Sequence, residues 1–369
     1  MKHILHIIPD DKFSEKTIDF YSSLDFIKSD YITIKKEPFL YLNKNAVISL
    51  PLFSSELRKC VNNSKYDAIV FHSLGIKTML LIVLFIKKAF VIWRTYGNDL
   101  YSLVYNQSRI HRPLTYGYFR KNEKALYFKI VFKNFLYRTL FKIGVKKINI
   151  ISCHLNEEFD LLQAKYKLKA KKSFLPIGFF PVSKNFNNIT NGNNLLIGQS
   201  ASLWNNHLDI FPLIKSNLNC FETIICPLSY PQLSNAKYKK KVIAEANFYF
   251  NDKFKPLIEF LPEEEYNKVL CTFKAAIFYH ERQAALANII ICLFLGINVF
   301  MSKTNCLYDY LLRIGLNIYA FPEEFTPENI NYKINSLQLE NCHNILQEHI
   351  WLTYDETYLA AKVFFEENL

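Results

Sequence analysis

A break at residues 176–194 is the feature that most constrains the fold of this 369-residue chain. It contains two prolines, two glycines and six asparagines and shows neither helical nor strand periodicity. On each side of it, short apolar runs alternate with helix-like stretches, which predicts parallel sheets covered by helices. Because the chain also exceeds the usual size of one hydrophobic core, we expect two α/β domains, residues 1–180 and 190–369.

The predicted strands are apolar runs bounded by turn residues. They cover residues 3–8, 31–35, 46–50, 67–71, 90–93 and 149–153 before the break, and 195–198, 222–226, 260–261, 275–279 and 298–301 after it. Helices are expected near 15–23, for about 15 residues after Gly75, and near 157–166, 208–216, 235–246, 263–272, 284–295 and 354–367. The last of these helices is free to pack on either domain. Two doubly wound, Rossmann-like sheets of this kind place the carboxyl ends of their strands at an interdomain cleft, the expected active site.

Positive charge is concentrated in the first half of the chain. Residues 1–184 hold 31 Lys and Arg against 14 Asp and Glu, whereas the remainder holds 14 against 19. The densest stretch, residues 109–147, has eleven basic residues interleaved with aromatic ones. Such a stretch suits the face of an anionic membrane or, alternatively, a nucleic acid. It is also compatible with a solvated helix whose aromatic side chains pack inward.

Several kinds of site have no counterpart in the sequence. The nine glycines never form G-x-G-x-x-G, and there is no P-loop, G-x-S-x-G or H-E-x-x-H motif. No Asp-x-Asp and no C-x-x-C pair occurs, so we expect no metal site and no cofactor. The longest apolar runs, 79–86 and 289–297, are far shorter than the ~20 residues of a membrane span, and the N-terminus does not resemble a signal peptide. We expect a cytoplasmic protein.

The stretch 195–207, L-L-I-G-Q-S-A-S-L-W-N-N-H, carries the strongest functional signal. An apolar run ends at Gly198, hydroxyl groups follow at Ser200 and Ser202, and Asn206 and His207 stand at the expected start of a helix. Glycine permits close approach of a ligand, and the free N–H groups of a helix start attract anions. This arrangement suits the diphosphate of a nucleotide-sugar, although an ordinary strand-to-helix turn with a Ser cap has the same pattern.

Five segments together resemble glycosyltransferase family 56, the bacterial 4-acetamido-4,6-dideoxygalactosyl (Fuc4NAc) transferases. They are V-I-W-R-T-Y-G-N-D-L-Y at 91–101, I-G-Q-S at 197–200 with Asn206 and His207, C-P-L-S-Y-P at 226–231, Y-H-E-R-Q at 279–283, and the strand and loop from Met301 to Asn305. Asp11 and His72 also fall where the family has an Asp after its first strand and a Phe-His pair. The likeness runs in order over residues 3–320. Two departures are Tyr96, where the family has Trp, and A-A-L-A-N at 284–288, where it has a Gly-rich segment.

The resemblance implies a two-domain GT-B glycosyltransferase that uses a dTDP-sugar and a polyprenyl-diphosphate-linked glycan in surface polysaccharide assembly, as in enterobacterial common antigen. The expected partners are thus a nucleotide-sugar donor, this lipid-linked acceptor and the anionic inner face of the bacterial cytoplasmic membrane, with no nucleic acid. With no metal clamp expected, protein groups alone would neutralise the diphosphate. The departures leave open a different donor, such as a UDP-amino sugar, or a nucleotide-sugar binder without catalysis.

The roles of individual residues follow from these expectations. We expect the second domain to bind the donor through Gly198, Ser200, Asn206, His207, Tyr230, Arg282, Gln283 and Asn305. Arg282 would neutralise the leaving diphosphate, unless it merely pairs with Glu281, and Tyr230 would stack on the base, unless it is a core aromatic. For the base that deprotonates the acceptor hydroxyl, Asp99 is the first candidate, followed by Asp11 and His72. Asp99 is equally suited to cap a helix.

Overall fold

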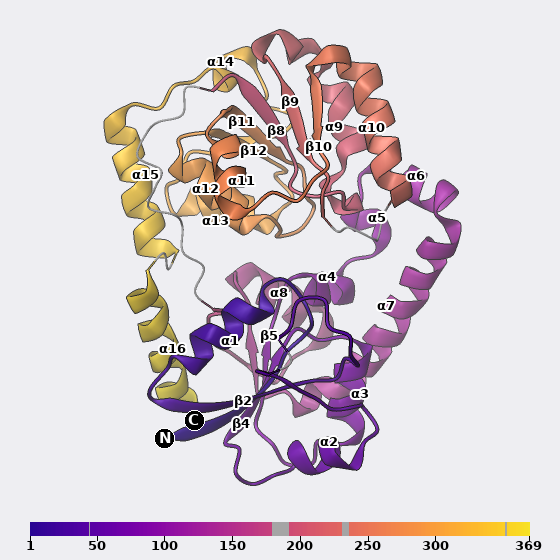
Figure 1. The fold of residues 1–369 in the computed structure, drawn as a ribbon, viewed down its shortest axis with the longest axis vertical. Coiled ribbons are helices and arrows are strands. Elements are labelled where there is room, and N and C mark those ends of the chain that lie inside the picture. The colour runs from indigo at the N-terminus through magenta and orange to yellow at the C-terminus, as the bar shows by residue number, and fades with distance from the viewer. Residues whose placement is uncertain (44, 179–191, 231–235, 351–352) are drawn as a thin grey trace. The chain divides into compact units, whose positions relative to one another are not determined.

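The computed structural model describes residues 1–43, 45–178, 192–230, 236–350 and 353–369. The described chain forms two compact units. Unit 1 comprises residues 1–105, 128–178 and 353–369, and unit 2 comprises residues 106–127, 192–230 and 236–350. Each unit contains one parallel sheet flanked by helices (Figure 1), so the predicted fold class of two Rossmann-like doubly wound domains is confirmed.

Unit 1 has a seven-stranded sheet of order β3-β2-β1-β4-β5-β6-β7. Its strands are β1 (Lys2–Ile7), β2 (Ile27–Thr33), β3 (Ile48–Ser49), β4 (Ala68–His72), β5 (Val91–Arg94), β6 (Ile150–Ser152) and β7 (Lys171–Lys172). Its helices are α1 (Ser14–Ser22), α2 (Ser55–Cys60), α3 (Ile76–Leu84), α4 (Asn98–Val104), most of α7 (Lys124–Gly144), α8 (Asn156–Tyr166) and α16 (Tyr354–Asn368). All neighbouring strands run parallel, as the βαβ pattern predicts.

The C-terminal helix α16 belongs to unit 1. It begins with a capping box, in which Thr353 and Glu356 each accept a hydrogen bond from the other's backbone N–H. Its buried face, Ala361, Phe364 and Phe365, joins the core that contains Ile4 and Val70, and the helix lies beside the N-terminal elements (Figure 1). Burying each Phe contributes about 2 kcal/mol, so α16 is an integral part of this core.

Unit 2 has a six-stranded sheet of order β10-β9-β8-β11-β12-β13. Its strands are β8 (Asn194–Ile197), β9 (Ile224–Pro227), β10 (Phe254–Leu257), β11 (Phe273–Phe278), β12 (Asn298–Met301) and β13 (Tyr319–Ala320). Its helices are α5 (Gln107–Ile110), α6 (Pro113–Asn122), α9 (His207–Ile214), α10 (Ala236–Phe250), α11 (Glu263–Leu270), α12 (Leu286–Phe294), α13 (Cys306–Arg313), α14 (Pro327–Ile330) and α15 (Ser336–His349). Short 3₁₀ turns cover Leu203–Asn205, Lys215–Cys220 and Asn251–Lys253.

Helices α5 and α6 lie in unit 2 although they come from the first half of the chain. The carboxylate of Asp209 on α9 accepts the backbone N–H groups of Leu114 and Thr115 at 2.8 and 2.9 Å. This contact supplies acceptors and negative charge to the first turn of α6, where N–H groups lack partners within the helix. It thereby fastens α6 to α9.

Some predicted elements differ from the structure. The strand expected at 260–261 is wrong, because the strand is β10, whose Lys and Pro are tolerated at the edge of the sheet. Strand β2 starts earlier than predicted, since its exposed Lys28 interrupts the apolar run on which the prediction relied. Helix α3 is nine residues long rather than about 15. Residues 179–191 of the expected linker lie outside the described residues, as do Pro231 and residue 235, where we expected a helix to begin.

Candidate functional site

The strand order of unit 2 reverses direction between β8 and β11. The chain moves outward from β8 to β9 and β10, then returns to add β11 on the other side of β8. In open α/β sheets of this kind, ligands bind outside the carboxyl ends of the strands at such a reversal. The loops at this point begin at Gly198 and at Tyr279, and both contain predicted donor-binding residues.

The loop after β8 is held together by Asn205. Gly198 has a φ of +67°, and a Cβ there would lie 2.6 Å from the Asn205 side-chain oxygen, so any other residue would strain the loop. That oxygen accepts the N–H of Gln199 at 3.1 Å, and the Asn205 amide donates to both the carbonyl and the hydroxyl of Ser200 at 3.0 Å. Ser200 therefore helps to shape the loop. The sequence pattern did not single out Asn205.

Asn206 and His207 connect this loop to its neighbours. Asn206 adopts the left-handed conformation, with a φ of 55°, and its amide donates to the Tyr279 carbonyl at 2.9 Å, which joins the loops after β8 and β11. His207 is fully buried, and its Nδ1 lies 3.3 Å from the Tyr238 hydroxyl. Burial lowers the pKa of His207 to about 3, so the imidazole is neutral at neutral pH.

Arg282 and Asn305 bring the loops after β11 and β12 together. The Arg282 guanidinium lies over the Trp204 ring, 4.7 Å from its centroid, and only 6% of the residue is exposed. The Asn305 amide donates to the Arg282 carbonyl at 2.9 Å, while its oxygen accepts the N–H of Leu307 and caps α13. Gln283, also buried, accepts from Arg282 through its carbonyl at 3.4 Å.

Tyr230 belongs to the loop after β9, and its carbonyl accepts the Ala201 N–H at 2.7 Å. All eight predicted donor-binding residues thus lie in loops after β8, β9, β11 or β12, or at the helix starts that follow these loops.

A partly buried ion pair that the sequence pattern did not indicate lies among these loops. Arg112, between α5 and α6, pairs through its Nε with the carboxylate of Glu281. Its Nη2 donates to the Ser302 hydroxyl at 2.9 Å, and its guanidinium lies 4.4 Å from the centroid of the Tyr279 ring. Glu281 also accepts from the hydroxyls of Ser302 and Thr304. This pair fixes Glu281 beside Arg282.

The sheet of unit 1 has an equivalent reversal between β1 and β4. Asp11 follows β1, and His72 is the last residue of β4. His72 Nε2 lies 2.9 Å from His6 Nδ1, both rings are fully buried, and burial lowers both pKa values. This neutral imidazole pair lies near the carboxyl ends of the central strands β1 and β4 and packs against Tyr21.

Asp99 and Asp11 differ in how their oxygens are occupied. Asp99 accepts four hydrogen bonds of 2.9–3.0 Å, from the backbone of Leu74, Tyr96 and Leu100 and from the Trp93 indole. It therefore holds three segments together. In Asp11, Oδ1 accepts the Phe13 N–H and the Ser14 hydroxyl, whereas no donor among the described residues reaches Oδ2. Burial raises the pKa of the Asp11 carboxyl above its usual range.

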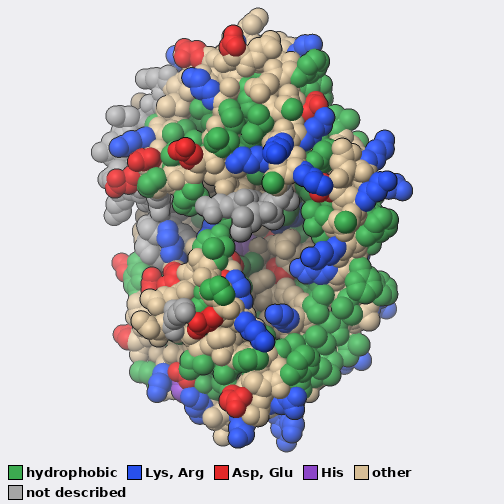
Figure 2. Space-filling view, turned by 45° about the vertical axis from the view of Figure 1, so that its right-hand side comes forward, with side chains coloured by type: hydrophobic (Ala, Val, Ile, Leu, Met, Phe, Trp, Pro, Cys, Tyr) green, Lys and Arg blue, Asp and Glu red, His purple; other side chains and the backbone are tan. Residues whose placement is uncertain are grey.

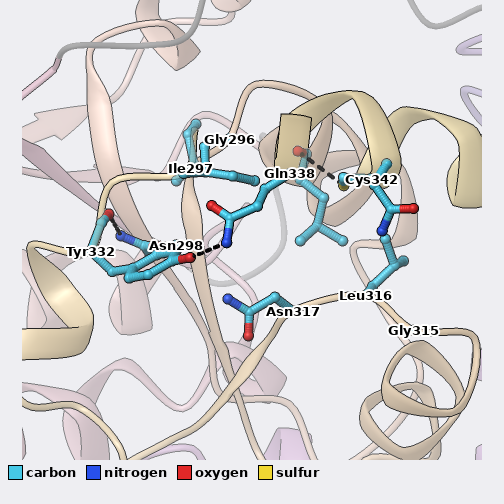
Figure 3. A pocket seen from close by; sticks show the side chains of 12 residues that line it. Gly296, Ile297, Asn298, Gly315, Leu316, Asn317, Tyr332, Gln338 and Cys342 are labelled. Atoms are coloured by element: carbon cyan, nitrogen blue, oxygen red, sulfur yellow. Dashed lines mark hydrogen bonds between the residues drawn. The ribbon is translucent and has the colours of Figure 1, made fainter. Parts of the chain in front are cut away.

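A pocket of about 340 Å³ lies at the opposite edge of the sheet in unit 2, near the start of β12 (Figure 3). Side-chain amides line it, including those of Asn298, Asn317 and Gln338, and Gln338 donates to the Tyr332 hydroxyl at 2.7 Å. No charged side chain from the described part of the chain lines it. It lacks the cations that a diphosphate requires, so the candidate donor site is the carboxyl edge.

Two doubly wound sheets, each with polar loops at its carboxyl edge, are the architecture of the two-domain GT-B class of glycosyltransferases. A model of the family described as 4-alpha-L-fucosyltransferase, glycosyl transferase group 56, matches residues 129–346. The chain therefore belongs to this family of glycosyltransferases, and the resemblance found in the sequence is confirmed. No curated protein matches the sequence.

Solved structures share the fold at low sequence identity. The trehalose-6-phosphate phosphatase N-terminal domain of Candida albicans superposes with a TM-score of 0.61 at 11% identity, and the match covers 100% of this chain and 100% of that one. The sucrose-phosphate synthase of Thermosynechococcus elongatus gives 0.57 at 11% identity, over 99% of this chain and 95% of that one. Anabaena HepE in complex with UDP-glucose gives 0.56 at 13% identity, also over 99% and 95%. These matches show the fold alone.

Proposed function

We propose that this glycosyltransferase moves a deoxyamino sugar such as Fuc4NAc from a dTDP-sugar to a polyprenyl-diphosphate-linked oligosaccharide, in the assembly of a surface polysaccharide like enterobacterial common antigen. The observation that carries the proposal is that Gly198 and Arg282 lie in the two loops at the strand-order reversal of unit 2, with the Asn305 amide bonded to the Arg282 carbonyl. Membership of the fucosyltransferase family and the structural match to a protein in complex with UDP-glucose support it.

The donor diphosphate would bind between the helix start at His207 and the guanidinium of Arg282. A helix N-terminus supplies N–H donors and partial positive charge, and a guanidinium can bind two phosphate oxygens at once. Because both imidazoles near this point, His207 and His280, are neutral, Arg282 would carry the positive charge there. This arrangement would stabilise the leaving diphosphate without a metal ion.

For the base that deprotonates the acceptor hydroxyl, Asp11 fits best. Its Oδ2 has no donor among the described residues. Burial raises the pKa of both carboxyls, Asp11 and Asp99, so the choice between them rests on the accessible oxygen of Asp11. Asp99 would have to give up one of its four hydrogen bonds to act as the base. We assign Asp99 a positioning role and His72 a supporting role behind the loop after β1.

Helix α7 would dock on the anionic membrane that carries the acceptor. Phe128, Phe132 and Phe135, which share one face of α7 by spacing, are 67, 69 and 65% exposed. Lys129 and Lys133 are exposed beside them, and hydrophobic side chains gather with basic ones on this face of unit 1 (Figure 2). Aromatic insertion combined with positive charge is the pattern of interfacial helices. Within the described residues, no helix combines the length and apolar character needed to cross a bilayer.

One other donor and one other function are consistent with some of these observations. A UDP-amino sugar would use the same diphosphate contacts and differ only at the base and the sugar. Nucleic-acid binding is favoured only by the basic charge of the first half, whereas exposed Phe side chains on α7 favour a lipid surface.

A panel of nucleotides and nucleotide-sugars tests the proposal. We expect dTDP and dTDP-sugars to raise the melting temperature more than UDP or UDP-sugars, and transfer to a lipid-linked acceptor to follow the same order. Arg282→Ala should abolish most of the shift without unfolding the protein, whereas Arg313→Ala, a change of an arginine on α13, should retain it. Stabilisation by DNA or RNA alone, with steep salt dependence, would contradict the proposal.

A further inference from the structure

A basic and apolar hollow of about 650 Å³ lies in unit 1. It is bordered by the segments that follow β2 and β3 and by the first turn of α3. Its apolar side chains include Ile34, Leu52 and Phe53, and its basic ones are Lys35, Lys36 and Lys77. Its volume is in the range of ~300–1,000 Å³ that small-molecule sites occupy.

Among the described residues, two of the three lysines have no compensating carboxylate. Lys35 forms an ion pair with Asp10. Within the described part of the chain, no carboxylate lies within ion-pair distance of Lys36 or Lys77, and both side chains are exposed. Lys77 stands at the N-terminus of α3, where the helix dipole adds further positive charge. The hollow is therefore suited to an anion with more than one charge.

The apolar side of the hollow continues onto the surface. Phe53 is 64% exposed, and its ring packs edge-on against that of Phe85 at 6.0 Å. Leu84, next to Phe85, is 55% exposed. Exposed large hydrophobic side chains beside uncompensated cations match an anionic amphiphile, with a phosphate or diphosphate at one end and an aliphatic chain at the other.

Asp10 links the hollow to the loop that contains Asp11. Its carboxylate accepts Lys35 Nζ and the backbone N–H groups of Leu40, Tyr41 and Leu42, the last three at 3.0, 2.9 and 3.1 Å. These bonds hold the segment that contains Lys35 against the end of β1. A ligand in the hollow thus lies beside the loop whose next residue, Asp11, we assign as the base.

We propose that this hollow binds the diphosphate and the first isoprene units of the lipid-linked acceptor. Lys36 and Lys77 bind the diphosphate oxygens, Phe53 and Leu52 contact the isoprene chain, and the glycan extends toward Asp11. The inference rests on the proposed function for the identity of the acceptor, but the hollow's preference for an isoprenyl diphosphate is testable without any transfer reaction.

Farnesyl diphosphate is the probe, with binding measured by titration calorimetry on the full chain. We expect Lys36→Ala/Lys77→Ala to weaken its binding at least tenfold. The matched control, Lys59→Ala/Lys87→Ala, removes two other exposed lysines of unit 1 and should leave binding unchanged. Phe53→Ser should weaken binding of farnesyl diphosphate but not that of inorganic diphosphate, which lacks the chain.

The outcomes separate this inference from the proposed function. Equal affinity of the wild type and Lys36→Ala/Lys77→Ala for farnesyl diphosphate overturns the inference, even if sugar transfer occurs. A Lys36→Ala/Lys77→Ala variant that binds anionic phospholipid vesicles more weakly than the wild type, but binds farnesyl diphosphate equally well, also overturns it. The hollow would then bind a phospholipid headgroup. Lysine-dependent binding of farnesyl diphosphate supports the hollow as an isoprenyl-diphosphate site even if no sugar reaches a lipid-linked acceptor, in which case the proposed function alone fails.

Discussion

The guanidinium of Arg112 and the carboxylate of Glu281 form an ion pair within unit 2, although Arg112 comes from the first half of the chain. Glu281 is 4% exposed, and its carboxylate is held by this partner and by two hydroxyl donors. The ion pair therefore connects the segment 106–127 to the loop that contains Arg282.

Arg112→Ala should destabilise the protein by about 2–4 kcal/mol, because it leaves a buried carboxylate without its cation. The value lies toward the lower end of the range for buried pairs, since the Arg112 side chain is 29% exposed. Urea unfolding measures this change. Adding Glu281→Gln should recover part of the loss, because no buried charge then remains. If Arg112→Ala alone is as stable as the wild type, the ion pair contributes little to folding stability.

Most of the fold follows from sequence pattern, whereas the position of residues 106–127 does not. The runs that become β1, β4, β8 and β11 are mostly apolar and are buried at consecutive positions, and this marks parallel strands covered on both faces. By contrast, α6 is attached to unit 2 by the Asp209 carboxylate, a contact between residues far apart in sequence. No local periodicity encodes such a contact.

In the candidate site, too, the sequence pattern predicts some residues and not others. Gly198 was recognisable because a glycine after an apolar run indicates a turn, and the structure gives it a positive φ. Asp99 and Asp11 look alike in sequence, since each follows a predicted strand. Their hydrogen bonds distinguish them, because Asp99 has four donors, whereas no donor among the described residues reaches one oxygen of Asp11. Asn205 was missed because its partners become neighbours only when the loop closes.

Gly198→Ala should lower stability by about 1–3 kcal/mol and weaken donor binding. The substitution forces a side chain into a left-handed backbone conformation and displaces the Asn205 oxygen, 2.6 Å from the new Cβ. Gly117→Ala is the matched control, because Gly117 lies inside α6 with nothing within 4 Å of a new Cβ. This control should raise the melting temperature, since Ala favours a helix over Gly. Equal melting temperatures for the two variants would refute the strain argument.

Asp11→Asn should reduce sugar transfer by ~10²-fold or more if Asp11 is the base. The base must be ionised, so activity of the wild type should rise with pH as the carboxyl passes through its raised pKa, and this acidic limb should disappear in the variant. Asp99→Asn should chiefly lower the melting temperature, because an amide replaces one acceptor oxygen with a donor. If Asp99→Asn instead removes the acidic limb of the pH profile in a stable protein, Asp99 is the base and Asp11 is not.

Neutralising Lys129, Lys133 and Lys142 with Gln should weaken binding to anionic vesicles by roughly 1 kcal/mol per charge, or about a hundredfold in total. Arg138 is left unchanged, because it donates to the carbonyls of Ser102 and Tyr105 and supports the fold. Lys215, Lys237 and Lys240 of unit 2 provide a control with the same change of charge. Co-sedimentation with vesicles measures the effect. Equal losses in both triple variants would mean that only net charge matters.

Glu158→Gln should flatten the dependence of folding stability on pH. Burial raises the pKa of Glu158 from 4.5 to about 7 in the folded protein. The unfolded chain then releases this proton at lower pH than the folded chain, so stability falls as the pH rises from about 4.5 to about 7, by about 3 kcal/mol in total. Glutamine carries no charge and can still accept the Leu155 N–H at the start of α8, as Glu158 does at 3.2 Å. Urea unfolding at pH 5 and pH 8 should therefore show a smaller difference for Glu158→Gln than for the wild type. Asp160→Asn, an exposed change on the same helix, is the control and should keep the wild-type difference in stability between the two pH values. If Glu158→Gln also keeps that difference, Glu158 is already ionised in the folded protein at pH 5.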